Sequence, residues 1–217
     1  MPTSALKLFK LASGRSQRFS FLNTMRKELA DCRTCLDVGC GNQSFIRFLG
    51  FEYTVGVEYF APVLEEAKKA ATHNDFCFAD VTEIDRHFSE NQFDCCVALD
   101  VIEHLTKENG YKLIRDMERI ARKKILLFTP NGFLPQHSLY DNALQVHLSG
   151  WTAQEMQALG FKVIGMYGPK FMRGEQHQHK FKPAGFFGMV AAFLHFAFIR
   201  WQPKYAAAIV CIRDVSR

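Results

Sequence analysis

Short apolar runs alternate along this chain with longer stretches in which apolar residues recur every three or four positions. The runs predict buried strands, and the recurring pattern predicts amphipathic helices. Near-continuous apolar runs of this kind are typical of strands that are covered on both faces. Strands are predicted at 36–38, 53–57, 76–79, 93–99, 124–128, 161–167 and 206–212.

Helices are predicted between most of these strands. The clearest has Leu113, Met117 and Ile120 on one side. Another begins at Thr152, with Glu155 three positions later in the arrangement of a capping box. Together the patterns predict helices at 15–31, 44–49, 62–71, 108–121 and 152–159.

Alternating strands and helices predict an α/β fold with a mostly parallel sheet covered on both faces. A chain of 217 residues is long enough for one full core, so residues 1–217 are predicted to form a single domain. Sheets of this kind bind ligands beyond the carboxyl ends of their strands.

A glycine turn follows the first predicted strand, where the chain reads L-D-V-G-C-G-N-Q-S. Gly39 and Gly41 permit a sharp turn and let a ligand lie against the backbone. The helix start after them offers unpaired N–H groups. The third glycine of a dinucleotide site is replaced by Ser44, which favours a nucleoside ligand without a pyrophosphate.

Acidic residues stand at four strand ends: Asp37, Glu58, Asp80 and Asp100. Glu58 comes nineteen positions after Gly39, the distance expected for a carboxylate that accepts hydrogen bonds from ribose hydroxyls. One acidic strand end is often only a helix cap. Four of them behind a glycine turn favour ligand binding, and Asp80 could accept from an adenine amino group.

The segments L-D-V-G-C-G, V-G-V-E, F-A-D-V and F-D-C-C-V-A-L-D-V-I-E-H-L resemble the class I S-adenosylmethionine-dependent methyltransferases. The resemblance covers residues 30–168 and places this domain close to the ubiquinone-pathway O-methyltransferase group. It implies a Rossmann-like, seven-stranded, mostly parallel sheet with helices on both faces and an antiparallel edge formed by the last strands.

The same resemblance implies S-adenosylmethionine as the cofactor and assigns its contacts along the strand ends. By it, Glu58 holds the ribose and Asp100 closes the site. The methionine end is lined by Asp37, Gly39, Cys40 and Gly41, and the adenine is flanked by Asp80 and Val81.

The segment D-V-I-E-H after the fourth strand carries the candidate catalytic groups, Glu103 and His104. Because the sulfonium already activates the methyl group, the protein must position the acceptor and remove its proton. His104 has a pKa suited to a general base. It could instead cap a helix in a cofactor loop.

A divalent cation is the third interpretation. D-x-x-E-H is similar to the E-x-x-E-H of ubiquinone-pathway O-methyltransferases and small-RNA 2′-O-methyltransferases, in which these residues bind magnesium. Here the first position is Asp100, and His147 would be a further ligand. Such a set would suit a cation that also acts as a Lewis acid, although the sequence does not commit to a metal site.

The connection over 131–150 is long and therefore predicted to be functional. Its place after the fifth strand predicts that it covers the acceptor pocket and that at least one polar residue touches substrate. The chain has no N/D-P-P-Y/F after the fourth strand, which argues against methylation of an adenine amino group in DNA. The polar residues of this loop are Gln136, His137, Tyr140, Asp141, Asn142, Gln145 and His147.

An insertion at 171–203 separates the last two strands. It begins basic and continues over 185–201 as a run that is apolar all round apart from His195. A spanning helix needs about 20 residues, so crossing a membrane is the least favoured interpretation. The run could pack against the sheet or a second subunit, or lie in a membrane surface with Arg200 and Trp201 at the headgroups.

Charge and cysteine content indicate which partners and which cellular compartment to expect. The net charge of +5 permits an anionic partner, and residues 1–27 carry six Lys and Arg without Asp or Glu. A mitochondrial presequence looks similar, although an ordinary leading helix is favoured. Seven cysteines without a disulfide pattern indicate a reducing compartment, so a cytoplasmic enzyme is expected. The lone C-x-x-C at 32–35 lacks the second pair of a zinc site.

Taken together, the sequence predicts an enzyme that moves a methyl group from S-adenosylmethionine to an oxygen of a small molecule, which could be lipid-like. RNA 2′-O-methylation is the alternative reaction, although no separate RNA-binding module supports a nucleic-acid partner. A non-catalytic scaffold that binds the cofactor and docks to a partner or a membrane through 185–201 is the alternative class.

Overall fold

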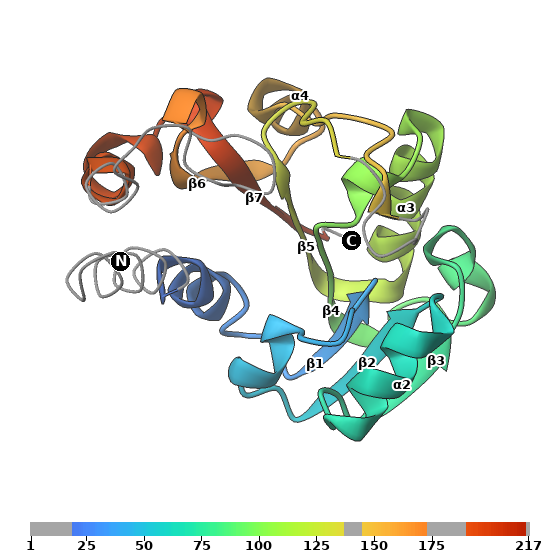
Figure 1. The fold of residues 1–217 in the computed structure, drawn as a ribbon. Coiled ribbons are helices and arrows are strands. Elements are labelled where there is room, and N and C mark those ends of the chain that lie inside the picture. The colour runs from blue at the N-terminus through green and yellow to red at the C-terminus, as the bar shows by residue number, and fades with distance from the viewer. Residues whose placement is uncertain (1–18, 137–144, 173–189, 216–217) are drawn as a thin grey trace, which may run out of the picture. The chain divides into compact units, whose positions relative to one another are not determined.

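The computed structural model describes residues 19–136, 145–172 and 190–215, and its seven strands form one sheet (Figure 1). The strand order is β3-β2-β1-β4-β5-β7-β6. The strands are β1 (Thr34–Val38), β2 (Tyr53–Glu58), β3 (Asp75–Phe78), β4 (Phe93–Leu99), β5 (Ala121–Pro130), β6 (Lys162–Pro169) and β7 (Ala206–Asp214).

The first five strands pair in parallel, whereas β7 runs antiparallel to β5. The parallel pairs are β1 with β2, β1 with β4, β2 with β3 and β4 with β5. Beside β7, the Asn131 N–H donates to the carbonyl of Ala207, and the Val215 N–H donates to the carbonyl of Lys123. The residue number rises along β7 as the number of its partner on β5 falls, which is the antiparallel pattern. The predicted fold class is confirmed.

The helices agree with the prediction at their centres and differ at their ends. Residues 19–28 are helical and a turn follows at 29–31, while the start of the predicted leading helix lies outside the described residues. The predicted helix at 44–49 is a 3₁₀ turn, η1 (Phe45–Phe48). The longer helices are α2 (Ala61–Lys69), α3 (Lys107–Ile120) and α4 (Ala153–Ala158).

Two further 3₁₀ turns, η2 (Val81–Arg86) and η3 (Ile102–His104), follow β3 and β4 and were not predicted. Short 3₁₀ turns have no long hydrophobic period, so the apolar pattern does not reveal them. Strand β5 also begins earlier than predicted, directly after α3, because Ala121 already has an extended conformation.

The chain divides into two compact units. Unit 1 comprises Met1–Thr24 and Thr129–Cys211, and unit 2 comprises Met25–Phe128 and Ile212–Arg217. The single methyltransferase domain over 1–217 stays a prediction. Among the residues that the structure describes, no helix combines the length and apolarity needed to cross a membrane.

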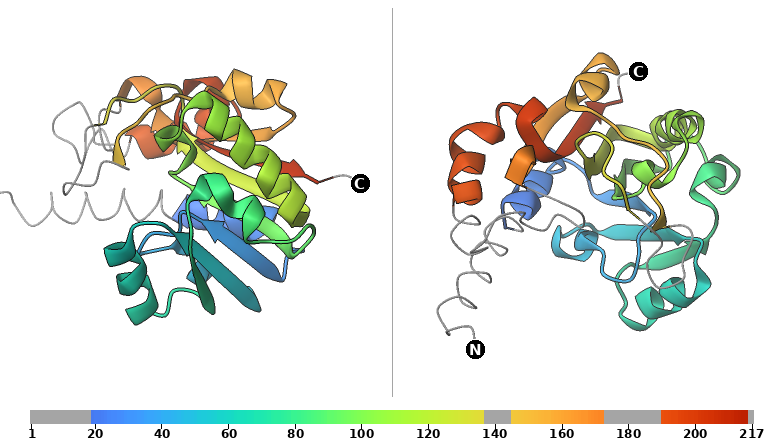
Figure 2. Two further views of the ribbon diagram at one scale, coloured as in Figure 1. Left: turned by 90° about the vertical axis from the view of Figure 1, so that its right-hand side faces the viewer. Right: turned by 45° about the horizontal axis from the view of Figure 1, so that its top comes forward.

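The core of unit 2 lies around β1, β4 and α3. The α3 side chains Leu113, Met117 and Ile120 are completely buried, as their spacing predicted, and α3 packs on β4 (Figure 2). Burying each such side chain contributes roughly 1.5–3 kcal/mol. This packing holds β4, the strand that Asp100 follows, against α3.

In unit 1, the described part of the insertion has one buried face. Residues 190–194 are helical, and a π-helical turn, η7 (His195–Ile199), continues them. Ala191, His195 and Ile199 are buried at spacings of four, while Phe193 is 72% exposed. The sequence is apolar on all sides of this run, but only one side of the described segment is buried.

The buried face packs on β6 of the same chain. A Cβ at Gly165 would lie 2.2 Å from the carbonyl oxygen of Ile199, so only glycine permits this approach. His195 Nε2 lies 2.9 Å from Ser20 Oγ, and Arg200 donates to Thr24 Oγ1 at 2.9 Å. Packing on the chain's own sheet is confirmed for this segment, and residues 173–189 lie outside the described part.

Asn131 joins three elements of unit 1. It is buried, and its side-chain amide donates to the carbonyls of Pro203, Lys204 and Ala206, at 2.8–3.2 Å. Its Oδ1 accepts from the N–H of Ala153 at the start of α4. One side chain thus connects the end of β5 to the starts of α4 and β7.

We expect Asn131→Ala to lower the free energy of unfolding by roughly 2–4 kcal/mol, because several buried backbone groups lose their partner. Gln136→Ala is the matched control, since Gln136 donates to one backbone carbonyl, that of Gln145, and should cost about 1 kcal/mol or less. Urea unfolding of both variants measures the difference, and equal losses would contradict the role of Asn131.

Candidate active site

The glycine turn after β1 has the predicted conformation. Gly39 and Gly41 have φ values of +70° and +57°, in the left-handed region that favours glycine. A Cβ at Gly39 would also come within 2.6 Å of Val101 Cγ2. The turn is therefore specific for glycine at its first position for two separate reasons.

Asp37 lies behind this turn rather than on its surface. The residue is 1% exposed, and its Oδ2 accepts from Ser44 Oγ at 2.5 Å and contacts His73 Nε2 at 3.0 Å. Ser44 Oγ also accepts from the N–H of Ile46 and so begins η1. Asp37 thus fixes the turn from beneath, and its predicted contact with the methionine end of the cofactor stays a prediction.

His73 is a site residue that the sequence analysis missed. It is buried, and its second nitrogen, Nδ1, lies 3.0 Å from Thr72 Oγ1. A Cβ at Gly56 of β2 would approach both His73 Nδ1, at 2.9 Å, and Cys40 Sγ, at 2.8 Å. Because Gly56 has no side chain, His73 and the buried Cys40 can lie directly against the backbone of β2.

Glu58, at the end of β2, connects the glycine turn to the next strand. Its Oε2 accepts from the N–H of Gly41 at 3.2 Å, and its Oε1 accepts from the N–H of Phe60 at 2.8 Å. The carboxylate is half-buried and held in one orientation. Because a carboxylate has about four acceptor positions, two remain for a ligand.

Asp80 is the cap of η2, as the alternative interpretation of an acidic strand end proposed. Its Oδ1 accepts from the N–H of Thr82 at 2.8 Å and from the hydroxyl of Thr82 at 2.7 Å. Val81 is the first residue of η2. Capping occupies one carboxylate oxygen, so it does not conflict with a ligand contact through the other.

Asp100 follows β4 in a left-handed conformation, with φ of +54°. Its N–H donates to the carbonyl of Phe128 at 2.9 Å. Part of Asp100 is exposed, yet the surrounding protein desolvates its carboxyl group and raises its pKa, while a hydrogen bond with Glu103 acts in the opposite direction. Glu103 itself is 2% exposed.

His104 is the last residue of η3 and is half-buried. The cap of α3 is Thr106, whose hydroxyl accepts from the N–H of Asn109 at 3.3 Å. Thr106, rather than His104, therefore caps α3, and the role of His104 stays a prediction. Glu103 and His104 are adjacent and offer a carboxylate and an imidazole, which are ligand types that divalent cations accept.

His147 belongs to unit 1 and is buried. Its Nδ1 lies 2.6 Å from the carbonyl oxygen of Leu134, so Nδ1 carries the proton and Nε2 is the acceptor nitrogen of the neutral ring. Burial lowers the pKa of His147 and favours that neutral form.

The two described ends of the 131–150 loop meet where the side-chain amide of Gln136 donates to the carbonyl of Gln145. The other polar residues predicted for this loop lie outside the described residues: His137, Tyr140, Asp141 and Asn142.

Comparison with known proteins agrees with this geometry. Residues 36–128 match the family model described as a methyltransferase domain. A human protein named "Probable tRNA methyltransferase 9B" is 30% identical over 85 residues, which are 39% of this chain and 18% of that protein. Its Bos taurus counterpart is 27% identical over the same length. The match thus spans less than a fifth of these relatives.

Solved structures share the fold at low identity. The methyltransferase domain of bacterial CtHen1 has a TM-score of 0.55 at 17% identity, with 92% of this chain and 98% of that chain covered. An S-adenosylmethionine-dependent methyltransferase from Archaeoglobus fulgidus has a TM-score of 0.54 at 14% identity, with 95% and 94% covered.

We expect Asp100→Asn to stabilise the protein increasingly as the pH rises. Desolvation raises the pKa of Asp100 from 3.8 to about 7, so ionising it in the folded state costs stability, and the cost grows as the pH rises through that range. Asparagine has the same shape and tolerates the left-handed conformation. The gain in melting temperature should be larger at pH 8 than at pH 5.

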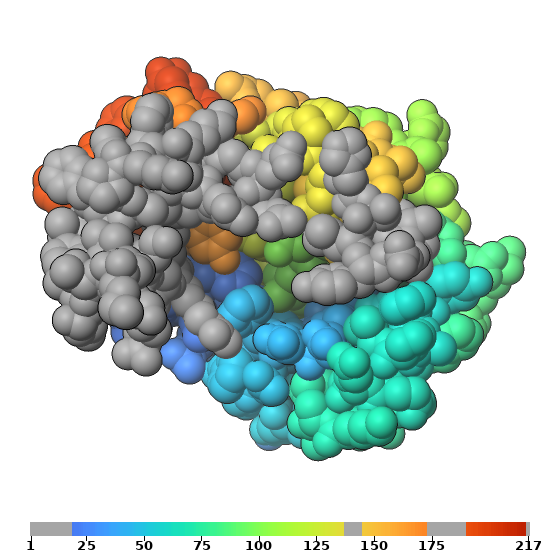
Figure 3. Space-filling model, in the orientation of Figure 1, coloured from blue at the N-terminus to red at the C-terminus, as the bar shows by residue number. Residues whose placement is uncertain are grey.

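Glu65→Gln is a control of opposite sign for this experiment. Glu65 lies on α2, and its side chain is 58% exposed. The teal surface that includes α2 is at the lower right of Figure 3. A hydrogen bond from Lys68 lowers the pKa of Glu65, so its carboxylate adds stability above the unfolded pKa. This variant should lose a little stability at pH 8. A pH-independent gain in Asp100→Asn would contradict the desolvation argument.

Proposed function

We propose that this chain, whose residues 36–128 match a methyltransferase domain, is a class I S-adenosylmethionine-dependent methyltransferase that methylates an oxygen atom of a small-molecule acceptor. The observation that carries the proposal is the sequence of groups after β4, in which a carboxyl group of raised pKa, a buried carboxyl group and a half-buried imidazole follow one another as Asp100, Glu103 and His104.

The strand ends of unit 2 fit the methyl donor. We assign the ribose hydroxyls to Glu58, whose orientation is already fixed by two backbone N–H groups. We assign the adenine to Asp80 and Val81, and the methionine end to the turn at Gly39 and Gly41. The donor supplies a methyl group on a positively charged sulfur, which needs no further activation by the protein.

The remaining chemical task is to remove the acceptor's proton as its oxygen forms a bond to the methyl carbon. We propose that His104 receives this proton, because an imidazole is half protonated near neutral pH and can then release the proton to water. Glu103 is a positioning residue in this scheme, buried beside His104 and hydrogen-bonded to Asp100.

His147 is the second candidate for an acceptor-side role. Its Nδ1 is committed to the Leu134 carbonyl, so Nε2 is the nitrogen that could accept a proton or bind a cation. A magnesium-dependent reaction would give Glu103 and His104, in unit 2, the role of ligands. Titration of the protein with magnesium in the presence of the donor distinguishes a ligand role from a base role.

RNA methylation is the second candidate function. It is supported by the names of the mammalian relatives, which match 85 residues of this chain. A screen that detects release of S-adenosylhomocysteine, run with tRNA and with small hydroxylated compounds, separates the two acceptor classes. Release with tRNA alone would overturn the small-molecule proposal.

We expect His104→Gln to reduce kcat by about 10²–10⁴ while changing the donor Kd by no more than about threefold, because a general base acts in the transition state. Calorimetry with S-adenosylhomocysteine measures the affinity, and a single-turnover assay with an acceptor from the screen measures the rate. His87→Gln, at an exposed histidine after η2, is the matched control. Unchanged turnover in His104→Gln would favour a scaffold role or another base.

We expect His73→Ala to weaken donor binding roughly tenfold, since a hydrogen bond to a charged group contributes about 1.5–3 kcal/mol and part of that holds the glycine turn. His73 is a positioning residue that acts through Asp37. Calorimetry measures the donor Kd, and kcat at saturating donor should change little. An unchanged Kd would show that the turn does not depend on His73.

A further inference from the structure

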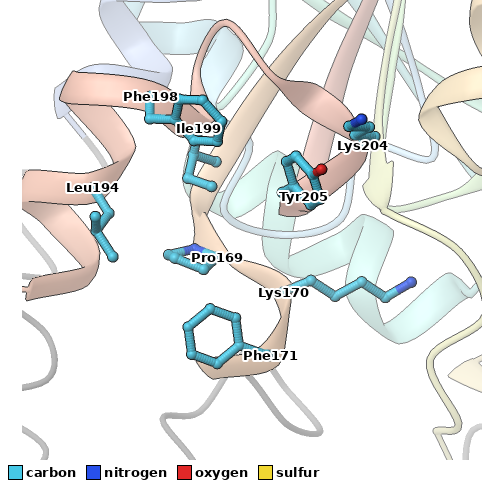
Figure 4. A pocket seen from close by; sticks show the side chains of 8 residues that line it. All are labelled: Pro169, Lys170, Phe171, Leu194, Phe198, Ile199, Lys204 and Tyr205. Carbon is cyan, nitrogen blue, oxygen red and sulfur yellow. The ribbon is translucent and has the colours of Figure 1, made fainter.

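Unit 1 contains a cavity of about 660 Å³ between the described part of the insertion and the strands on which it packs (Figure 4). Ligand pockets generally have volumes of about 300–1,000 Å³. One wall is formed by Leu194, Phe198 and Ile199. The opposite wall comes from the residues after β6, including Phe171.

The wall that carries Leu194 and Phe198 is firmly anchored. Its other face is formed by Ala191, His195 and Ile199, which are at most 3% exposed. His195 contacts Ser20, and burial lowers the pKa of His195 to about 4, so the ring is neutral at physiological pH. The cavity is therefore a feature of the packed unit, since the segment beside it is held on its buried side.

The aromatic lining is exposed rather than buried. Phe171 is 66% exposed, Phe198 48% and Tyr205 49%. Single exposed apolar residues need no explanation, but a gathering of them around one cavity marks a binding surface. Phe193 and Trp201, both more than 70% exposed, lie on the same insertion.

Two lysines complete the lining at its polar side. Lys170 and Lys204 extend away from the apolar side chains of Leu194 and Phe171 in Figure 4. Within the part of the chain that the structure describes, neither amine forms a salt bridge. Lys204 Nζ lies 4.7 Å from the centre of the Tyr205 ring. Lys170 Nζ lies close to Gly132, because a Cβ added to that glycine would be 2.8 Å from it.

The charge of the whole unit has the same sign. Unit 1 contains 11 Lys and Arg against 3 Asp and Glu, a formal charge of +8, and unit 2 contains 16 against 19, a formal charge of −3. Among the described residues of unit 1, the basic residues Lys162, Lys170, Arg200 and Lys204 outnumber the acidic residue Glu155. An anionic group beside Lys170 and Lys204 would therefore be attracted by these two amines without a neighbouring excess of negative charge.

We propose that this cavity binds an anionic amphiphile, with one hydrocarbon chain against Leu194, Phe198 and Phe171 and a phosphate or carboxylate head between Lys170 and Lys204. The chain gains from leaving water. The head gains charge-assisted hydrogen bonds from two ammonium groups. The ligand could come from solution or from a membrane, and the two sources share this chemistry.

Dodecyl phosphate, kept monomeric, is the probe for the full-length protein, and dodecanol is its uncharged counterpart. Calorimetry should show saturable binding of dodecyl phosphate and roughly tenfold weaker binding of dodecanol. Lys170→Glu combined with Lys204→Glu should remove the preference for the phosphate. Phe198→Ser should weaken binding of both compounds.

Matched controls distinguish binding in the cavity from non-specific binding elsewhere on the protein. Lys69→Glu changes an exposed lysine at the end of α2, and Phe19→Ser changes a 63% exposed phenylalanine outside the lining. Both should bind the probe as the unchanged protein does, and thermal melting confirms that every variant is folded. No saturable binding, or equal losses in the controls, would overturn the proposal.

Vesicles distinguish the two sources of the ligand. Phosphatidylcholine vesicles with and without phosphatidylglycerol are sedimented with each variant. Binding of monomeric dodecyl phosphate without vesicle binding identifies a soluble amphiphile, whereas vesicle binding that dodecyl phosphate and Phe198→Ser both reduce identifies a membrane lipid. Vesicle or tRNA binding that is unaffected by Phe198→Ser, with no binding of the probe, would overturn the cavity as the site.

Discussion

The buried carboxylate of Asp37 is the constraint on which the donor side of this protein depends. A charge removed from water is tolerated only where hydrogen bonds replace its hydration. Ser44 and His73 supply them, and each also belongs to a neighbouring element: Ser44 begins η1, and His73 precedes β3. The carboxylate therefore holds the glycine turn, the following 3₁₀ turn and the adjacent strand connection in one arrangement.

Asp100 stands in a contrasting environment at the end of β4. Desolvation raises its pKa, and its left-handed backbone presents the carboxyl group directly after the strand. Two aspartates at neighbouring strand ends thus have different tasks: one is held within the structure, while the other is partly exposed and hydrogen-bonded to Glu103. The same residue type serves both tasks because its burial and hydrogen-bond partners differ between the two strand ends.

The sequence predicted the features that local patterns encode. The strands, the buried side of α3 and the Thr152 cap followed from periodicity and capping chemistry, and Thr152 does accept from the N–H of Glu155. His73 could not be found in this way, because its partner Asp37 lies 36 positions earlier and no motif joins them. The buried side of 190–199 was equally hidden, since Gly165 on β6 selects it.

The division of charge between the units matches the charges of the two proposed ligands. Unit 2 has a net negative charge and carries the carboxylates assigned to a donor that bears a cationic sulfur, whereas unit 1 has a charge of +8. A single sign over the whole chain would attract one of two oppositely charged ligands and repel the other. Segregation removes this conflict within a chain whose net charge is only +5. The arrangement therefore suits a cationic donor and an anionic second ligand bound by the same chain.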